Sequence, residues 1–299
     1  MINCLVLMIL IFLFGECYSS DFYKHWGDGQ AEISSYDVKV LRYNQMRSGR
    51  AVLIFVTEDI NTETLIKVES PTPKNERMYV MKLNHIIRFN TGIYDYSVMS
   101  SVFSQVVGID WPFALRKVTM SAQDWCGHIF DEVKVDANRV EGRINSYFER
   151  DGLSSYTIPI YSGFVSGDGV LVRMRELGGE WLEPGEQIPI SLFPSLWGIR
   201  LRGLQRKIIE ATLSKGMAKD LELSSQVIPA HKWQLDFGNT WEKYWVEKAY
   251  PHRILAWEFS DGGRGELRET VRLSYWLLNN NNNAEYRRLL DIDPEKSGY

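Results

Sequence analysis

The pentapeptide Asp124-Trp125-Cys126-Gly127-His128 is the strongest cue for chemistry in this 299-residue chain. On an extended strand, side chains alternate between two faces, so Asp124, Cys126 and His128 would project from the same face. A carboxylate, a thiol and an imidazole in one row could begin a zinc site, or could form a thiolate nucleophile with histidine as its base. The three residues are therefore candidates for the centre of a hydrolase or a metal-dependent enzyme.

The same pentapeptide has a structural interpretation, which we favour. A free cysteine is commonly just buried, and Gly127 suggests a β-bulge that would break the row. The sequence holds no second ligand pair of the Cys-x-x-Cys or His-Glu-x-x-His type. The remaining histidines show no ligand spacing: His25, His85, His231 and His252. We therefore predict no metal and no cofactor, and we expect a non-catalytic protein.

Aromatic residues are abundant, with 10 Trp, 15 Tyr and 13 Phe. Four of them fall close together with charged residues between them: Trp233, Trp241, Tyr244 and Trp245. Rings in such an arrangement could stack on sugars or line an apolar cavity. The simpler interpretation, which we favour, is that the rings fill the core of a large β domain.

Period-two alternation of apolar residues is the dominant pattern along the chain, and it predicts many short strands. The run at 51–56 is apolar on both faces, which is typical of a strand covered on both sides. Hairpin turns are predicted at Asp151-Gly152 and at Asp261-Gly262-Gly263. Further strands are predicted at residues 36–41, 64–69, 79–89, 98–107, 115–125, 128–135, 140–148, 155–161, 170–175, 254–259 and 267–276.

Two stretches have helical character. Residues 201–224 mix apolar and charged residues but are interrupted by Gly216, so helix and strand both remain open for them. Residues 284–290 favour a short helix, with Asn283 suited as its N-cap. The predicted fold is mainly β, an antiparallel barrel or sandwich with one or two short helices.

The N-terminal residues predict export. Leu5 to Phe14 form an apolar run that matches a signal-peptide core and is too short for a bilayer, which takes about 20 residues. Cys17 stands where a bacterial lipoprotein carries its lipidated cysteine, with Glu16 where a small residue is usual. We expect an exported protein of the cell envelope, in the periplasm or at the outer membrane, with lipidation of Cys17 as an open alternative.

The chain divides into four predicted segments. These are a signal peptide over 1–16, a tether over 17–28, one β-rich domain over 29–293 with a candidate seam near 178–185, and a C-terminal tail over 294–299. The formal net charge is −4, and no cluster of Lys and Arg stands out. Because nucleic-acid proteins usually carry a basic stripe, we expect no nucleic-acid partner.

Several segments of the sequence together resemble one known family. The most specific block lies within residues 82–101 and includes Lys82-Leu83-Asn84, 89–94 (FNTGIY) and 96–101 (YSVMSS). The other matching segments are 31–36 (AEISSY), 51–60 (AVLIFVTEDI), 125–128 (WCGH), 146–149 (SYFE) and Tyr275-Trp276. These residues resemble an uncharacterised family of exported bacterial lipoproteins typical of the Bacteroidetes. The resemblance implies an envelope location and a fold that spans the mature chain, and it supplies no catalytic residues.

Members of that family sometimes carry the label septum formation inhibitor Maf. Maf proteins are α/β nucleotide pyrophosphatases, whereas this chain is predicted to be strand-rich, begins with a leader and shows no glycine-rich phosphate loop. The resemblance therefore does not imply pyrophosphatase activity.

The sequence thus leads to two functional hypotheses. The first is an envelope protein with a non-catalytic binding or scaffolding role, whose partner is a hydrophobic ligand or an envelope component and whose contact with the membrane runs through a lipid anchor if Cys17 is modified. The alternative is a hydrolase or metal-dependent enzyme centred on Asp124, Cys126 and His128.

Overall fold

The protein is mainly β, with 57% of the chain in strands and 14% in helices. The computed structural model describes residues 19–107, 112–223 and 226–292. Its strands form one large sheet that is antiparallel except where β9 pairs with β10, and in the described residues the sheet does not close on itself. The predicted β fold class is therefore confirmed. The strand order is β8-β7-β6-β5-β4-β3-β2-β1-β16-β15-β14-β13-β11-β10-β9, with β12 paired to β13.

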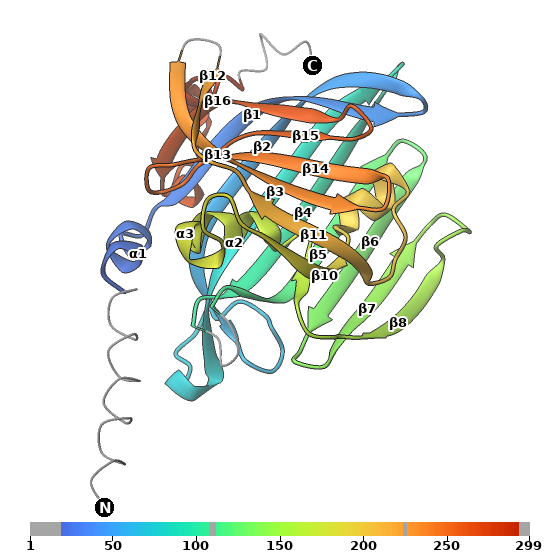
Figure 1. Cartoon of the computed structure of the whole chain (residues 1–299), viewed down its shortest axis with the longest axis horizontal. Coiled ribbons are helices and arrows are strands. Elements are labelled where there is room, and N and C mark those ends of the chain that lie inside the picture. Colours follow the sequence, from blue (N-terminus) through green and yellow to red (C-terminus); the bar gives the residue numbers. More distant parts are fainter. Residues whose placement is uncertain (1–18, 108–111, 224–225, 293–299) are drawn as a thin grey trace, which may run out of the picture.

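Two layers face each other because the long sheet folds back on itself (Figure 1). The first layer is an up-and-down meander of β1 (Ala31–Arg42), β2 (Gln45–Asn61), β3 (Arg77–Thr91), β4 (Tyr94–Gln105), β5 (Ala114–Asp124), β6 (Gly127–Val135), β7 (Arg139–Ser146) and β8 (Leu153–Pro159). The second contains β9 (Phe164–Ser166), β10 (Gln187–Phe193), β11 (Ile209–Lys215), β12 (Lys219–Leu223), β13 (Gln226–Phe237), β14 (Thr240–Glu247), β15 (Ile254–Phe259) and β16 (Arg264–Leu273). The layers are joined where β1 pairs with β16.

Short helices accompany the sheet. They are α1 (Ser19–Trp26), η1 (Lys74–Glu76), α2 (Val170–Glu176), α3 (Gly178–Trp181), the π-helical turn η2 (Gly198–Arg202), η3 (Tyr275–Leu277) and η4 (Asn281–Leu290). Part of the segment predicted as a tether is helix α1, and its Phe22 and Trp26 are buried in the main core. The same core draws on residues from both sides of the candidate seam, including Leu177 and Ile190.

Helix α2 corrects the strand predicted at 170–175. Val170, Val172 and Met174 have no exposed surface, so apolar residues occupy every side of the helix and leave no helical period to read. Its one buried cation, Arg175, donates to both carboxylate oxygens of Glu32 on β1, at 2.6 and 3.1 Å. Since both partners are buried, this pair fixes α2 against the first layer.

One other predicted strand is wrong, and the structure decides the two stretches that had helical character. Residues 64–69 form a loop that meets the sheet only through the Ile60–Lys67 bridge. The stretch at 201–224 contains the end of η2 followed by strands β11 and β12 rather than a helix. The predicted helix at 284–290 is confirmed within η4, although its N-cap is Asn280 and Asn283 completes the capping box.

The antiparallel register gathers four hairpin turns at one end of the first layer. The turns β1–β2, β3–β4, β5–β6 and β7–β8 all lie there, on the right of Figure 1, while α1 lies on the left. Helix α1 contacts the opposite strand ends, because Phe22 packs on Phe113 just before β5 and Tyr23 stacks on Tyr79 near the start of β3. The hairpin tips and the N-terminal helix therefore occupy opposite ends of the molecule.

Candidate functional site

The pentapeptide at 124–128 forms the tip of the β5–β6 hairpin. Asp124 pairs with Gly127, and Trp125 and Cys126 make the turn between them. One oxygen of Asp124, Oδ1, accepts the backbone N–H groups of Cys126 at 2.7 Å and Gly127 at 3.2 Å. Gly127 thus begins β6 rather than forming a bulge, and Cys126 leaves the strand row that was predicted to align it with Asp124 and His128.

The carboxylate of Asp124 has a structural role in this turn. Burial raises its pKa, but hydrogen bonds from the Tyr96 hydroxyl and from two backbone N–H groups outweigh burial and lower the pKa below its ordinary value. The side chains of Cys126 and His128 are exposed. In the described residues, no group of three or more His, Cys, Asp or Glu side chains is arranged to hold a metal ion.

The hairpin tips carry a row of mostly aromatic side chains, four exposed and one (Tyr94) half-buried, which we call the tip surface. Its members are Tyr43, Ile93, Tyr94, Trp125 and Tyr147. The exposed fractions are 56% for Tyr43, 86% for Ile93, 69% for Trp125 and 74% for Tyr147. Isolated exposed apolar residues are ordinary, but a contiguous set at one end of a domain commonly marks an interaction site.

Buried side chains hold the first half of the tip surface in place. The hydroxyl of Tyr43 lies 2.6 Å from that of Tyr96, whose ring stacks on Phe89 at a centroid distance of 5.0 Å. The guanidinium of Arg42 lies over the rings of both tyrosines. Tyr43 and Asn44 have φ values of 53° and 57°, as the two-residue turn between β1 and β2 requires, and this turn places Tyr43 at the tip.

The second half of the tip surface is held by one hydrogen bond and by ring packing. The indole N–H of Trp125 donates to Asp95 at 2.8 Å, and the Trp125 ring lies 6.5 Å from that of Tyr94. Tyr147 packs directly over Gly127, where an added Cβ would lie 2.5 Å from the tyrosine ring. Glycine at this position lets the Tyr147 ring approach the backbone closely, and the hydrogen bond to Asp95 orients the Trp125 ring before any ligand binds.

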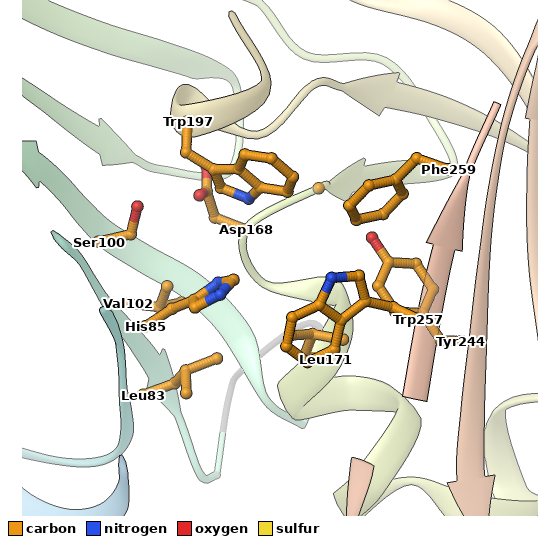
Figure 2. A pocket seen from close by; sticks show the side chains of 11 residues that line it. Leu83, His85, Ser100, Val102, Asp168, Leu171, Trp197, Tyr244, Trp257 and Phe259 are labelled. Carbon is orange, nitrogen blue, oxygen red and sulfur yellow. The ribbon is translucent and has the colours of Figure 1, made fainter. Parts of the chain in front are cut away.

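A second polar cluster lies between the layers. A cavity of about 20 Å³ is lined by His85 and Ser100 from the first layer and by Asp168 from the loop before α2. Figure 2 shows these side chains with Trp197 and Trp257 around them. That volume suits about one water molecule, so the cavity is far smaller than the several hundred Å³ of a typical ligand site.

Burial controls the protonation of this interior cluster. Burial lowers the pKa of His85 to about 4. Burial also raises the pKa of Asp168 to about 7, against the opposing effect of the Leu196 N–H that its Oδ2 accepts at 2.8 Å. His85 Nε2, Ser100 Oγ and Asp168 Oδ1 have no hydrogen-bond partner among the described residues. All three side chains are buried, and the space between them has room for about one water molecule rather than for a substrate.

The aromatic residues singled out at 233–245 belong to the β13–β14 hairpin. Trp233 and Tyr244 are buried in the core, and Trp241 and Trp245 are half-buried. The Tyr244 hydroxyl donates to Glu242 at 2.7 Å, and Arg202 from η2 binds Glu242 and Asp261. Trp233 and Tyr244 therefore fill the core, as the favoured interpretation predicted, whereas Trp241 and Trp245 stand at the half-buried alternate positions of β14.

Sequence reasoning missed both clusters, although each left a cue. His85 occupies an inward position in the apolar alternation Leu83, Ile87 and Phe89, which predicts a buried histidine. Tyr43 falls between two predicted strands, and Trp125 is the last residue of the strand predicted at 115–125, so both lie in or beside predicted turns. That they lie together follows only from the strand order.

Comparison with known proteins returned nothing, because no protein-family model, curated protein or solved structure matches the chain. Among the described residues, none of the helices has the length and apolar character needed to cross a membrane. Cys17 and the predicted signal peptide lie outside the described residues.

Proposed function

We propose that this chain is an exported, non-catalytic protein of the cell envelope that binds an envelope component through its tip surface. The observation that carries the proposal is the row of rings at the hairpin tips, in which Tyr43 and Trp125 are hydrogen-bonded to neighbouring side chains and Tyr147 packs over Gly127. Rigid aromatic side chains supply contact area at low entropic cost, because little freedom is lost when a ligand covers them.

The interior supports a surface site rather than an enclosed one. A hydrophobic ligand needs an apolar cavity of several hundred Å³, whereas the cavity beside His85 measures about 20 Å³. The enzyme alternative is less well supported, since Asp124 accepts the backbone N–H groups of its own turn and neither Cys126 nor His128 lines the interior cavity beside His85.

A sedimentation experiment tests the binding role. The full chain is expressed in an export-competent bacterium, purified, and mixed with the envelope fraction of that host. We expect the double variant Trp125→Ala/Tyr147→Ala to lose most of the bound fraction. Tyr161→Ala is the matched control, because Tyr161 is 65% exposed but follows β8 at the end of the molecule opposite the tips. Equal binding by both variants would overturn the proposal.

Export and anchoring are tested by mass. Intact-mass measurement of the protein from the membrane fraction should show loss of residues 1–16. If Cys17 carries a lipid, the acyl mass disappears in Cys17→Ser, and an unprocessed chain would contradict export itself.

A further inference from the structure

The tip surface combines ring faces with polar groups in a way that suits a particular ligand chemistry. Trp125 and Tyr147 expose their faces, and polar side chains lie among them, including Asp95, Asn44 and His128. A pyranose ring presents an apolar face of C–H groups and a rim of hydroxyls. The C–H face packs on an aromatic ring, while the hydroxyls donate to carboxylates and accept from amides.

The arrangement of the rings suits a chain of sugars rather than a single one. The rings stand on four successive hairpin tips and contact one another in order, from Tyr43 through Tyr96 and Tyr94 to Trp125. Tyr147 continues the row by packing over Gly127, next to the Trp125 turn. A row of separate stacking positions at the edge of a domain can hold successive units of a strand, as aromatic platforms do for single-stranded polymers.

A lipid surface fits the same residues poorly. Burying the tips in a bilayer would take the carboxylates of Asp95 and Asp124 out of water, at a large free-energy cost. Only one member of the tip surface, Ile93, is aliphatic. The formal net charge of −4 gives the protein no attraction to anionic headgroups. Phosphate-rich nucleic acids are disfavoured by the same charge.

The placement of α1 gives the tip surface a direction. Cys17, the candidate lipidation site, precedes Ser19 by two positions in the sequence, so a lipid attached there would tether the molecule from the α1 end. Helix α1 is at the end opposite the hairpin tips (Figure 1). An anchored molecule would therefore turn the tip surface away from its own membrane and toward the wall.

We infer that the tip surface binds a glycan strand of the cell wall, with sugar rings stacked on Trp125 and Tyr147 and hydroxyls bound by Asp95. This inference rests on the proposed envelope role and names the ligand class for the same surface. No bond is formed or broken in the complex, and the ligand is held by stacking and hydrogen bonds alone.

The test compares two probes. Wall sacculi stripped of protein and lipid are one, and vesicles of phosphatidylethanolamine and phosphatidylglycerol are the other. We expect the wild-type protein to sediment with sacculi and not with vesicles. Trp125→Ala and Tyr147→Ala should each weaken sacculus binding about tenfold, since one stacked ring contributes roughly that factor. Tyr161→Ala should bind like wild type, and Asp95→Asn should weaken binding while keeping the fold.

The outcomes separate the two proposals. Binding to vesicles or to unstripped envelope alone would overturn the proposal that the ligand is a glycan. The proposed binding role of the tip surface would still hold. Sacculus binding that is unchanged in Trp125→Ala and Tyr147→Ala would overturn the assigned surface. Absence of binding to every fraction would overturn both. Thermal unfolding of each variant, matched to wild type, excludes loss of fold as the cause.

Discussion

Two sets of aromatic residues in this molecule have similar composition and opposite environments. Trp233 and Tyr244 on the β13–β14 hairpin are buried, whereas Trp125 and Tyr147 at the hairpin tips expose most of their surface. The first set is dense in sequence, and the second is assembled from turns more than 20 residues apart. In this protein, aromatic residues that are close together in the sequence include core residues. Whether a ring is exposed depends on its position within the hairpin.

The reason lies in strand geometry. Within a strand that has one face on the core, every second side chain points inward, so Trp233 and Tyr244 are directed into the space between the layers. At a hairpin tip the chain reverses and no second layer covers the turn. A ring placed there stays in solvent unless a ligand or partner covers it.

The largest expected effect concerns the buried set. Trp233→Ala should cost about 3–5 kcal/mol in the free energy of unfolding, because it leaves a cavity against Trp181 and the core. Trp125→Ala should cost about 1 kcal/mol or less, since it loses only a surface contact and the Asp95 hydrogen bond. Urea unfolding measures both. Equal losses in the free energy of unfolding would mean that Trp125 is a structural residue like Trp233.

The next largest effect concerns the buried carboxyl group of Asp168 and the dependence of stability on pH. Asp168 has a pKa of about 7 in the folded chain against an ordinary value of 3.8, so the folded state holds this proton more tightly than the unfolded state does. Its contribution to stability is present below about pH 4 and is lost as the pH rises to about 7. Asp168→Asn keeps an acceptor for the Leu196 N–H and should be more stable than wild type at pH 8, by up to about 4 kcal/mol. A constant difference between pH 4 and pH 8 would show that Asp168 is solvated.

For His85, the free energy of unfolding changes with pH in the opposite direction. Its pKa of about 4 in the folded chain lies below the ordinary 6.5, so the unfolded state binds the proton more readily. Stability from this group is complete above about pH 6.5 and is lost as the pH falls toward 4, by up to about 3 kcal/mol. Relative to wild type, His85→Gln should lose less stability between pH 7 and pH 4.5 in urea unfolding. Parallel curves would contradict burial of the imidazole.

The smallest expected effect on stability comes from Gly127→Ala. The added Cβ would lie 2.5 Å from the Tyr147 ring, which can swing outward because it is on the surface. We expect a cost of about 1 kcal/mol or less and a severalfold loss of sacculus binding. Unfolding and sedimentation on the same preparation measure both quantities. Unchanged binding would mean that the orientation of Tyr147 is unimportant.

The sequence predicted the fold class and most of the strands because alternation is a local signal. Residues 79–89 and 254–259 fall inside β3 and β15, and the turn at Asp151-Gly152 joins β7 to β8. Helix α2 was missed because a helix that is buried on all sides has no amphipathic period.

The tip surface could not be predicted from local sequence patterns, for a different reason. Tyr43 and Trp125 meet in one surface only because β1 to β6 pair in sequence order, so that alternate turns fall at the same end. The contact of Tyr147 with Gly127 likewise requires the β6–β7 register. Strand order and register depend on long-range packing, which period and propensity do not encode.

Hydroxyl-radical footprinting of the wild-type protein, free and bound to sacculi, tests directly whether the tip surface binds the glycan strand, because it needs no substitution. If the tip surface holds the glycan strand, oxidation of Tyr43, Trp125 and Tyr147 falls on binding while oxidation of Tyr161 and Met217 stays unchanged. Protection of Tyr161 or Met217 with the tip residues still fully oxidised would contradict the claim.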